Sequence, residues 1–225
     1  MNKHRNPPIL IIDPAVKNPE LITFNHLTQT SPVPLTYHLP ALFGLQSLCK
    51  VKPEQVRGII ILGSLSSVNE KHSWQENLGH FLQPFFEAKT PVLGSCFGHQ
   101  FIAHLFGGKV QYVFPDQKKH LGFRKVRLKE NLLWGESREG ELYVSHNEQV
   151  VTVPKDFSVS AESPEIPIEG LSHNHLPIWS FQPHPEAGPK FQEVREDQSH
   201  LSDPKKFEFG NRLVSAFLHF CSGNK

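Results

Sequence analysis

The apolar positions in the first half of the chain follow two spacings. Short continuous apolar runs are typical of strands buried on both faces, and segments with apolar residues three or four apart are typical of helices. Strands are predicted over residues 9–12, 33–38, 56–62 and 92–93. Helices are predicted over residues 20–27, 39–48 and 74–88, the first with Asn18 as its N-cap and Pro19 in its first turn. This alternation predicts a parallel sheet wrapped by helices, with its site at the carboxyl ends of the strands.

The second half has a different pattern, in which short strand-like runs are separated by turns. Strands are predicted over residues 109–113, 123–128, 141–145, 149–153, 157–161, 166–171 and 177–181. Residues 193–200 are predicted to form a surface loop or an exposed helix, and residues 204–221 an amphipathic helix. The fold class is therefore α/β: a mostly parallel central sheet flanked by helices, with short antiparallel strands added in the second half. The length, with no repeat or clear linker, indicates a single domain over residues 1–225.

Composition narrows the class of protein. A hydrophobic content of 38% with 20% charged residues predicts a soluble globular chain. A formal net charge of +1 gives no electrostatic attraction to nucleic acid or to an anionic membrane. Three widely spaced cysteines indicate a reducing compartment and no disulfide framework. Since the N-terminal apolar run is too short for a signal peptide or a membrane span, we expect a cytoplasmic enzyme that binds neither nucleic acid nor membrane.

A cysteine at the apex of a tight turn is the candidate nucleophile. The turn Gly94-Ser95-Cys96-Phe97-Gly98 follows a predicted strand and precedes an apolar, helix-like segment. In this cysteine form of the nucleophile elbow, glycines flank the nucleophile because a side chain at either position would clash. The N-terminus of the helix favours a thiolate and offers backbone N–H groups to an oxyanion. A lone cysteine in such a turn is usually only a small buried residue, but the paired glycines favour the nucleophile.

Fourteen histidines raise the question of a metal site. The closest pair, His173 and His175, lies in a polar turn without a cysteine or carboxylate cluster at matching spacing, whereas structural zinc motifs use tighter, repeated spacings. We expect neither a metal site nor a cofactor.

A cysteine nucleophile needs a base, and a histidine near the C-terminus is the best candidate. His184 and Glu186 follow the last predicted strand, and residues two apart in an extended chain point to the same side. The carboxylate of Glu186 would then hold the imidazole of His184. A proline-rich loop with solvated charges would explain the same residues. His99 and His146 are rival bases, and His146 is the stronger because His99 is tied to the helix that follows Cys96.

Three segments together resemble the class I glutamine amidotransferase family, of the type with a Cys-His-Glu triad. The segments are residues 94–100, Val144-Ser145-His146-Asn147-Glu148-Gln149-Val150 and Gln182-Pro183-His184-Pro185-Glu186. The resemblance covers nearly the whole chain and implies a flavodoxin-like α/β fold. It also implies an enzyme in which Cys96 attacks the glutamine side-chain amide, forms a γ-glutamyl thioester and releases ammonia.

The resemblance implies roles for residues around the triad. The backbone N–H of Phe97 is one implied oxyanion donor, and the other belongs to Gly63 or Ser64. The residues that fall where the family contacts bound glutamine are Gln100, Ser145 and His146. The family usually has Gly-Gly-Pro after the third strand, where this chain has Gly63-Ser64-Leu65, and Pro183 stands where phenylalanine is usual. Because glycine lets the backbone approach a substrate closely, these departures bear on the substrate more than on the nucleophile.

Three functions follow from this pattern. The first is a glutamine amidohydrolase that supplies ammonia to a separate synthetase, since no synthetase domain is expected in a chain of this length. The second is a stand-alone hydrolase of γ-glutamyl peptides or amines, which the altered loop at Ser64 would suit. The third is a catalytically silent binding or regulatory module with the same fold, against which the intact triad argues.

Overall fold

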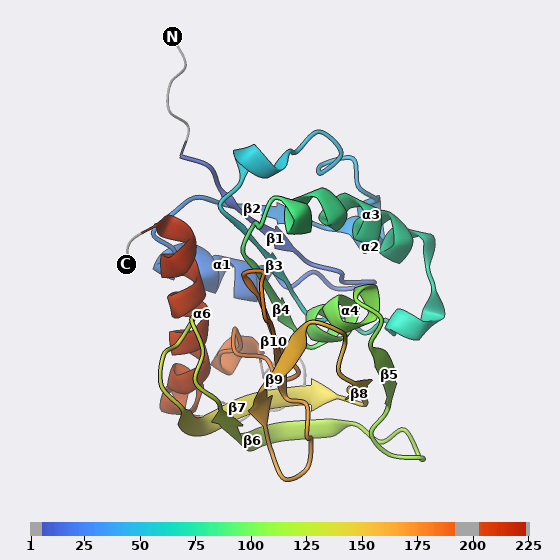
Figure 1. Ribbon diagram of the computed structural model, residues 1–225, viewed down its shortest axis with the longest axis vertical. Helices are drawn as coiled ribbons and strands as arrows, with labels where there is room; N and C mark the ends of the chain where they lie inside the picture. Colours follow the sequence, from blue (N-terminus) through green and yellow to red (C-terminus); the bar gives the residue numbers. More distant parts are fainter. Residues whose placement is uncertain (1–5, 192–202, 224–225) are drawn as a thin grey trace.

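The computed structural model describes residues 6–191 and 203–223. Within them, a nine-stranded sheet has the strand order β2-β1-β3-β4-β11-β10-β9-β6-β7 (Figure 1). The first five strands in this order are parallel: β2 (Leu35–His38), β1 (Ile9–Ile12), β3 (Gly58–Ile61), β4 (Val92–Ser95) and β11 (Ile178–Phe181). The other four are antiparallel: β10 (Gly170–His173), β9 (Phe157–Glu162), β6 (His120–Leu128) and β7 (Arg138–His146). A separate antiparallel pair consists of β5 (Lys109–Tyr112) and β8 (Glu148–Thr152).

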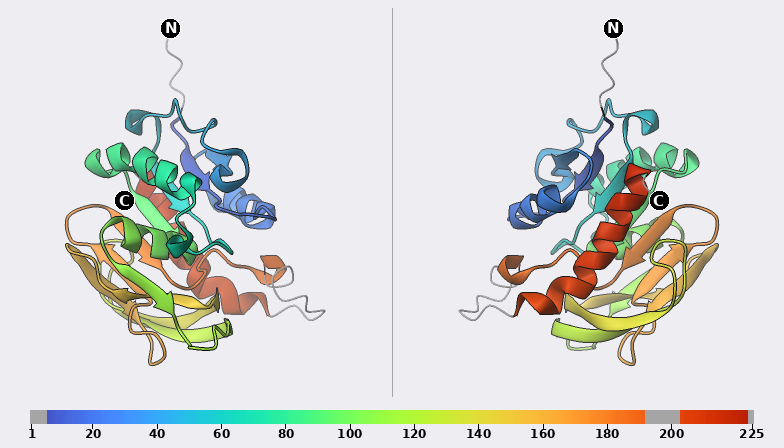
Figure 2. Two further views of the ribbon diagram at one scale, coloured as in Figure 1. Left: turned by 90° about the vertical axis from the view of Figure 1, so that its right-hand side faces the viewer. Right: turned by 90° about the vertical axis from the view of Figure 1, so that its left-hand side faces the viewer.

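Alternate residues of the parallel strands face two hydrophobic cores. In β1, Ile9 and Ile11 belong to a core that includes residues of α1 (Leu21–Thr30) and α6 (Glu208–Ser222). Leu10 and Ile12 belong to a second core with α3 (Ser73–Glu87) and α4 (Phe97–Leu105). Helices therefore cover both faces of the parallel strands (Figures 1 and 2). The predicted α/β fold with a mostly parallel centre and added antiparallel strands is confirmed.

The long predicted helices are present, with changes at their ends. The helix predicted over residues 74–88 is α3, and Pro84 lies in its last turn. The helix predicted over residues 204–221 is divided into a short 3-10 helix, Pro204–Phe207, followed by α6. The segment 193–200, predicted to be a loop or an exposed helix, lies outside the described residues. None of the described helices has the length and apolar character that crossing a membrane requires.

Three predicted elements differ in their bounds. The first helix begins at Leu21 rather than at Pro19, and Asp13 Oδ2 accepts a hydrogen bond from the N–H of Glu20 at 2.7 Å. The helix predicted over residues 39–48 is reduced to α2 (Pro40–Phe43), because Gly44 with φ +68° ends it. The strand predicted over residues 166–171 begins only at Gly170, since Ser163 Oγ accepts a hydrogen bond from the N–H of Ile166 at 3.0 Å in the turn that precedes it.

The close contact of α4 with the sheet depends on two glycines. A Cβ at Gly98 would lie 2.2 Å from the backbone oxygen of Ile61 in β3. A Cβ at Gly94 would lie 2.7 Å from the backbone of Gly98 and 2.7 Å from Cδ1 of Ile102. Since these neighbours are mostly backbone atoms, which cannot rotate away, any side chain at either position would push α4 off the strands.

Replacing Gly98 by alanine tests this contact. Although alanine is the better helix former, the overlap with Ile61 should lower the free energy of unfolding by about 2 kcal/mol. Urea denaturation of wild type and variant measures the difference. Gly188→Ala is the matched control, because a Cβ at Gly188 would have no neighbouring heavy atom within 4 Å. Equal stability of Gly98→Ala and wild type would contradict the packing argument.

Candidate active site

Cys96 lies at the junction between β4 and α4. Its backbone has φ 50° and ψ −104°, a region that residues other than glycine rarely occupy. The N–H of Cys96 donates to the backbone oxygen of Phe181 at 2.8 Å, so the end of β11 holds the turn in place. The side chain is buried, with 5% of its surface exposed. The strained turn therefore presents a thiol at the carboxyl edge of the parallel strands.

His184 and Glu186 follow the end of β11, beside the strand that leads to Cys96. The N–H of His184 donates to the backbone oxygen of Tyr143 at 2.8 Å, which anchors the segment to β7. Nδ1 of His184 and Oε1 of Glu186 are 2.9 Å apart, and both side chains are buried. With Nδ1 bonded to the carboxylate, Nε2 is the ring nitrogen available to a neighbouring thiol.

Gly63 is the point at which Cys96 and His184 converge. A Cβ at Gly63 would lie 2.7 Å from Cε1 of His184 and 3.5 Å from Cβ of Cys96. Burial by itself lowers the pKa of His184, but the charges of Cys96 and Glu186, with their hydrogen bonds, outweigh it and raise that pKa above its ordinary value. The arrangement therefore favours the protonated form of the His184 imidazole.

The two rival histidines, His99 and His146, form hydrogen bonds with other residues. Nδ1 of His99 lies 2.8 Å from Oγ of Ser180, and burial lowers the pKa of His99 to about 3. Nδ1 of His146 lies 2.9 Å from the backbone oxygen of Glu148, and its Nε2 lies 3.3 Å from Nη2 of Arg124. Burial, followed by the charge of Arg124, lowers the pKa of His146 to about 3. Both histidines are therefore neutral, and their contacts favour His184 as the base.

The implied oxyanion donors lie close to Cys96. Gly63 follows β3 and faces the cysteine, and Phe97 is the first residue of α4, where helical N–H groups lack partners within the helix. The hydroxyl of Ser64 donates to the backbone oxygen of Pro14 at 2.7 Å and accepts from the N–H of Ser66 at 3.1 Å. These two contacts hold the Ser64 side chain against the segment after β1 and within its own loop.

The three residues implied in glutamine contact make different contacts in the structure. The backbone oxygen of Ser145 lies 3.9 Å from Sγ of Cys96. The amide of Gln100 donates to the backbone oxygen of Glu148 at 3.0 Å and to Oε1 of Gln182 at 3.2 Å. The imidazole of His146 is bonded to the backbone of Glu148. The structure thus brings Ser145 to the nucleophile, while the side chains of Gln100 and His146 hold the surrounding backbone.

The sequence reasoning missed a buried ion pair behind this segment. Nη1 of Arg124 lies 2.7 Å from Oε1 of Glu169, and both side chains are almost fully buried. The same carboxylate oxygen accepts from Oγ of Ser163 at 2.7 Å, and the guanidinium also contacts His120 and His146. The sequence carried one signal of this pair: Glu169 directly follows the apolar run Ile166-Pro167-Ile168, where a buried carboxylate would need a partner.

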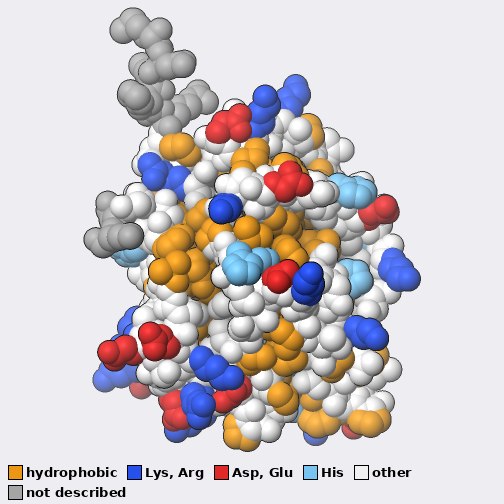
Figure 3. Space-filling view, viewed as in Figure 1, with side chains coloured by type: hydrophobic (Ala, Val, Ile, Leu, Met, Phe, Trp, Pro, Cys, Tyr) orange, Lys and Arg blue, Asp and Glu red, His pale blue; other side chains and the backbone are white. Residues whose placement is uncertain are grey.

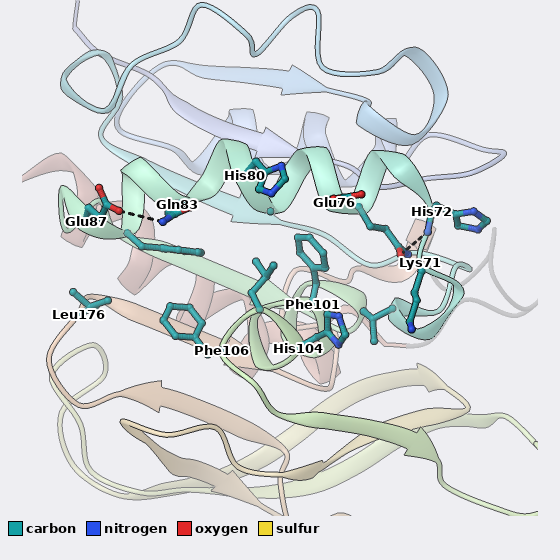
Figure 4. A pocket seen from close by; sticks show the side chains of 15 residues that line it. Lys71, His72, Glu76, His80, Gln83, Glu87, Phe101, His104, Phe106 and Leu176 are labelled. Atoms are coloured by element: carbon teal, nitrogen blue, oxygen red, sulfur yellow. Dashed lines mark hydrogen bonds between the residues drawn. The ribbon is translucent and has the colours of Figure 1, made fainter.

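A cavity of about 850 Å³ lies away from this site, between α3 and α4. Phe101, Phe106 and Leu176 line it, and so do Lys71 and His104 (Figure 4). Hydrophobic side chains surround histidine and charged side chains on this face (Figure 3). A smaller cavity of about 210 Å³ borders the Gly63–Ser64 loop. Among the described residues, no group of three or more His, Cys, Asp or Glu side chains is arranged to hold a metal ion.

Comparison with known proteins decides the family. The sequence profile described as glutamine amidotransferase class-I matches residues 33–198, well over half of the chain. The chain belongs to the class-I glutamine amidotransferase family. The predicted membership in this family, and with it the prediction of a glutamine amidotransferase-type enzyme, is confirmed.

Individual amidotransferases show how far the similarity reaches. The chain is 34% identical to a glutamine-hydrolyzing GMP synthase subunit of Pyrococcus abyssi over 139 residues, which are 61% of this chain and 70% of that protein. It is 31% identical to the glutamine-hydrolyzing GMP synthase of Neisseria meningitidis over 145 residues, 62% of this chain but 26% of that protein. A solved structure, a candidate GMP synthase subunit of Thermoplasma acidophilum, superposes with a TM-score of 0.72 over 98% of this chain and 96% of that chain, at 20% identity.

The charge state of His184 is open to direct measurement. We expect His184 to be protonated at neutral pH in the wild type and its pKa to fall in Cys96→Ala, because the variant removes the largest charge contribution that raises it. Since the folded-state pKa lies above the unfolded-state value, this contribution to stability is complete below the unfolded-state pKa. It is lost as pH rises through the folded-state pKa. Titration of the His184 ring protons by NMR measures its pKa in wild type and in Cys96→Ala, and urea denaturation as a function of pH measures the contribution to stability.

Glu186→Gln provides the comparison for this titration. It keeps the shape of the side chain and removes the second-largest charge contribution, so the pKa of His184 should fall less than in Cys96→Ala. A pKa of His184 that is the same in all three proteins would contradict the charged pair.

Proposed function

We propose that the chain hydrolyses the side-chain amide of glutamine through a triad of Cys96, His184 and Glu186. The observation that carries the proposal is the hydrogen bond of 2.9 Å between His184 and Glu186, next to a cysteine in a strained turn at the start of a helix. Burial of all three side chains supports it, because charge interactions are stronger where water is excluded.

In the first half of the proposed reaction, the thiolate of Cys96 attacks the amide carbon of glutamine. The negative charge that develops on the amide oxygen is stabilised by the backbone N–H of Phe97 and by a backbone N–H of the loop at Gly63 and Ser64. His184, held as an imidazolium by Glu186, donates its Nε2 proton to the leaving nitrogen. The carbon–nitrogen bond breaks, ammonia leaves, and the γ-glutamyl group remains on Cys96 as a thioester.

In the second half, water replaces ammonia. The neutral imidazole of His184 accepts a proton from water as its oxygen attacks the thioester carbonyl, and the same oxyanion donors stabilise the intermediate. The carbon–sulfur bond breaks, glutamate leaves, and the thiolate–imidazolium pair is restored. The proposed contact of the substrate with the Ser145–His146 backbone places the reacting carbon beside Sγ.

The ammonia is proposed to serve a separate synthetase. The support is the similarity to proteins named as glutamine-hydrolyzing subunits of GMP synthase, together with a match to about a quarter of the longer Neisseria protein. The nine-stranded sheet takes strands from both halves of the sequence, which supports a single amidotransferase domain over residues 1–225. The test of the partner is glutamine-dependent GMP formation when the chain is mixed with the synthetase subunit of GMP synthase from the same organism, with ammonium salt as the positive control.

Labelling of Cys96 tests the proposed chemistry. An electrophilic glutamine analogue should modify wild type once, at Cys96, and glutamine should slow the reaction. Glutamine hydrolysis, measured as ammonia release, should fall by about three orders of magnitude or more in Cys96→Ala and by at least about 100-fold in His184→Ala. Intact mass and peptide mapping identify the labelled residue.

Cys49→Ala is the matched control, because Cys49 is an exposed thiol far from the site in sequence and should be dispensable. Rapid labelling without protection by glutamine would move the proposal to the runner-up, a hydrolase of γ-glutamyl peptides or amines. Labelling of Cys96 no faster than that of Cys49 would contradict an activated nucleophile.

A further inference from the structure

Glu148 connects three parts of the site that are distant in the sequence. It is the first residue of β8, and 6% of its surface is exposed. Its Oε1 accepts a hydrogen bond from Oγ of Ser67 at 2.8 Å. Its backbone oxygen lies 3.0 Å from Nε2 of Gln100 and 2.9 Å from Nδ1 of His146. The loop after β3, helix α4 and the end of β7 therefore meet at one residue.

Ser67 belongs to the loop proposed to carry an oxyanion donor. Three residues separate it from Gly63, which lies against Cys96 and His184. The backbone oxygen of Ser67 accepts from Nε2 of Gln75 in α3 at 2.8 Å, so this end of the loop is bonded on two sides. A movement of Ser67 would be transmitted along this short span to Gly63.

The other end of the connection is the segment proposed to contact the substrate. The backbone oxygen of Ser145 is 3.9 Å from Sγ of Cys96, and the imidazole of His146 is bonded to the backbone of Glu148. The Ser67–Glu148 hydrogen bond thus joins a segment on one side of the thiol to a segment on the other. Misplacement of either one by a fraction of an ångström would misalign the oxyanion donors and the amide.

We propose that Glu148 and Ser67 are positioning residues that set the oxyanion loop against the substrate-contact segment. The inference rests on the proposed function, since it assigns these residues to the reaction at Cys96. β8 is also held by its pairing with β5 and by Val150 in the hydrophobic core. The fold of the strand therefore has support besides the carboxylate of Glu148, whose removal should act mainly on the loop.

The test compares glutamine hydrolysis in wild type, Ser67→Ala, Glu148→Ala, Glu148→Gln and the double alanine variant. Each alanine variant should lower kcat by about tenfold or more with a change in KM of less than about twofold, because the loop contributes more to the transition state than to binding. Glu148→Gln keeps an oxygen that accepts from Ser67 and should retain most of kcat. The double variant should be no slower than the slower single variant, because both remove the same bond.

Two further measurements separate positioning from general damage. Alkylation of Cys96 by iodoacetamide needs no oxyanion donor, so its rate should be the same in all variants. Hydrogen–deuterium exchange in a peptide covering residues 63–70 should be faster in Glu148→Ala than in wild type. Ser158→Ala is the matched control. It removes from β9 a hydroxyl that donates to Asn174, and it should leave both measurements unchanged.

The outcomes distinguish the proposed glutamine hydrolysis from the positioning role of Ser67 and Glu148. Wild type that releases no ammonia from glutamine would overturn the proposed function and the inference with it. Active wild type with undiminished kcat in Ser67→Ala and Glu148→Ala would overturn the positioning role alone. An equal loss of kcat and of alkylation rate would also overturn it, because that result indicates damage to the thiol and its base.

Discussion

The close approach of α4 to the sheet is the constraint on which the site depends. The backbone of Gly98 lies so near β3 that the space for a Cβ is already taken by the oxygen of Ile61. This contact fixes where the helix begins, and the chain must then turn at Cys96 through a conformation that residues other than glycine rarely adopt. The strain at the cysteine is offset by the packing of α4 in the hydrophobic core and by the hydrogen bond to Phe181.

Surroundings, rather than residue type, determine what each histidine near the cysteine does. His99, His146 and His184 are all buried, and burial disfavours the charged imidazole in each. Among these three, the pKa of His184 alone is raised, through its charge interactions and hydrogen bonds with Cys96 and Glu186. The guanidinium of Arg124 acts in the opposite direction on His146. The balance of nearby charges therefore separates a candidate base from two neutral structural histidines.

Strongly patterned features could be predicted from the sequence. The buried strands β1 and β3 are continuous apolar runs, and α3 has a clear helical spacing, so each was located to within a few residues. Local patterns were less informative where a turn residue decided the outcome, as at Gly44, which ends α2. The hydrogen bond from the N–H of Ile166 to Oγ of Ser163, in the turn before β10, had the same effect.

Around the site, short motifs were informative and long-range contacts were not. The glycines that flank Cys96 and the alternate carboxylate after His184 suggested one hypothesis, and the resemblance to the amidotransferase family was its stronger support. The Arg124–Glu169 pair and the Ser67–Glu148 bond join residues 45 and 81 positions apart. No periodicity connects such residues, so the contacts become visible only when the strands are placed side by side.

The position of β11 has a consequence for how the protein matures. β11 pairs in parallel with β4, yet six strands separate the two along the chain. Contacts of such long range form slowly, because a long loop must close before they contribute. During synthesis the cysteine leaves the ribosome well ahead of the histidine, and the two meet once β11 has inserted between β4 and β10. In the proposed triad, Cys96 therefore acquires its base only after β11 has paired with β4, and a nascent chain that lacks this pairing has the cysteine without the base.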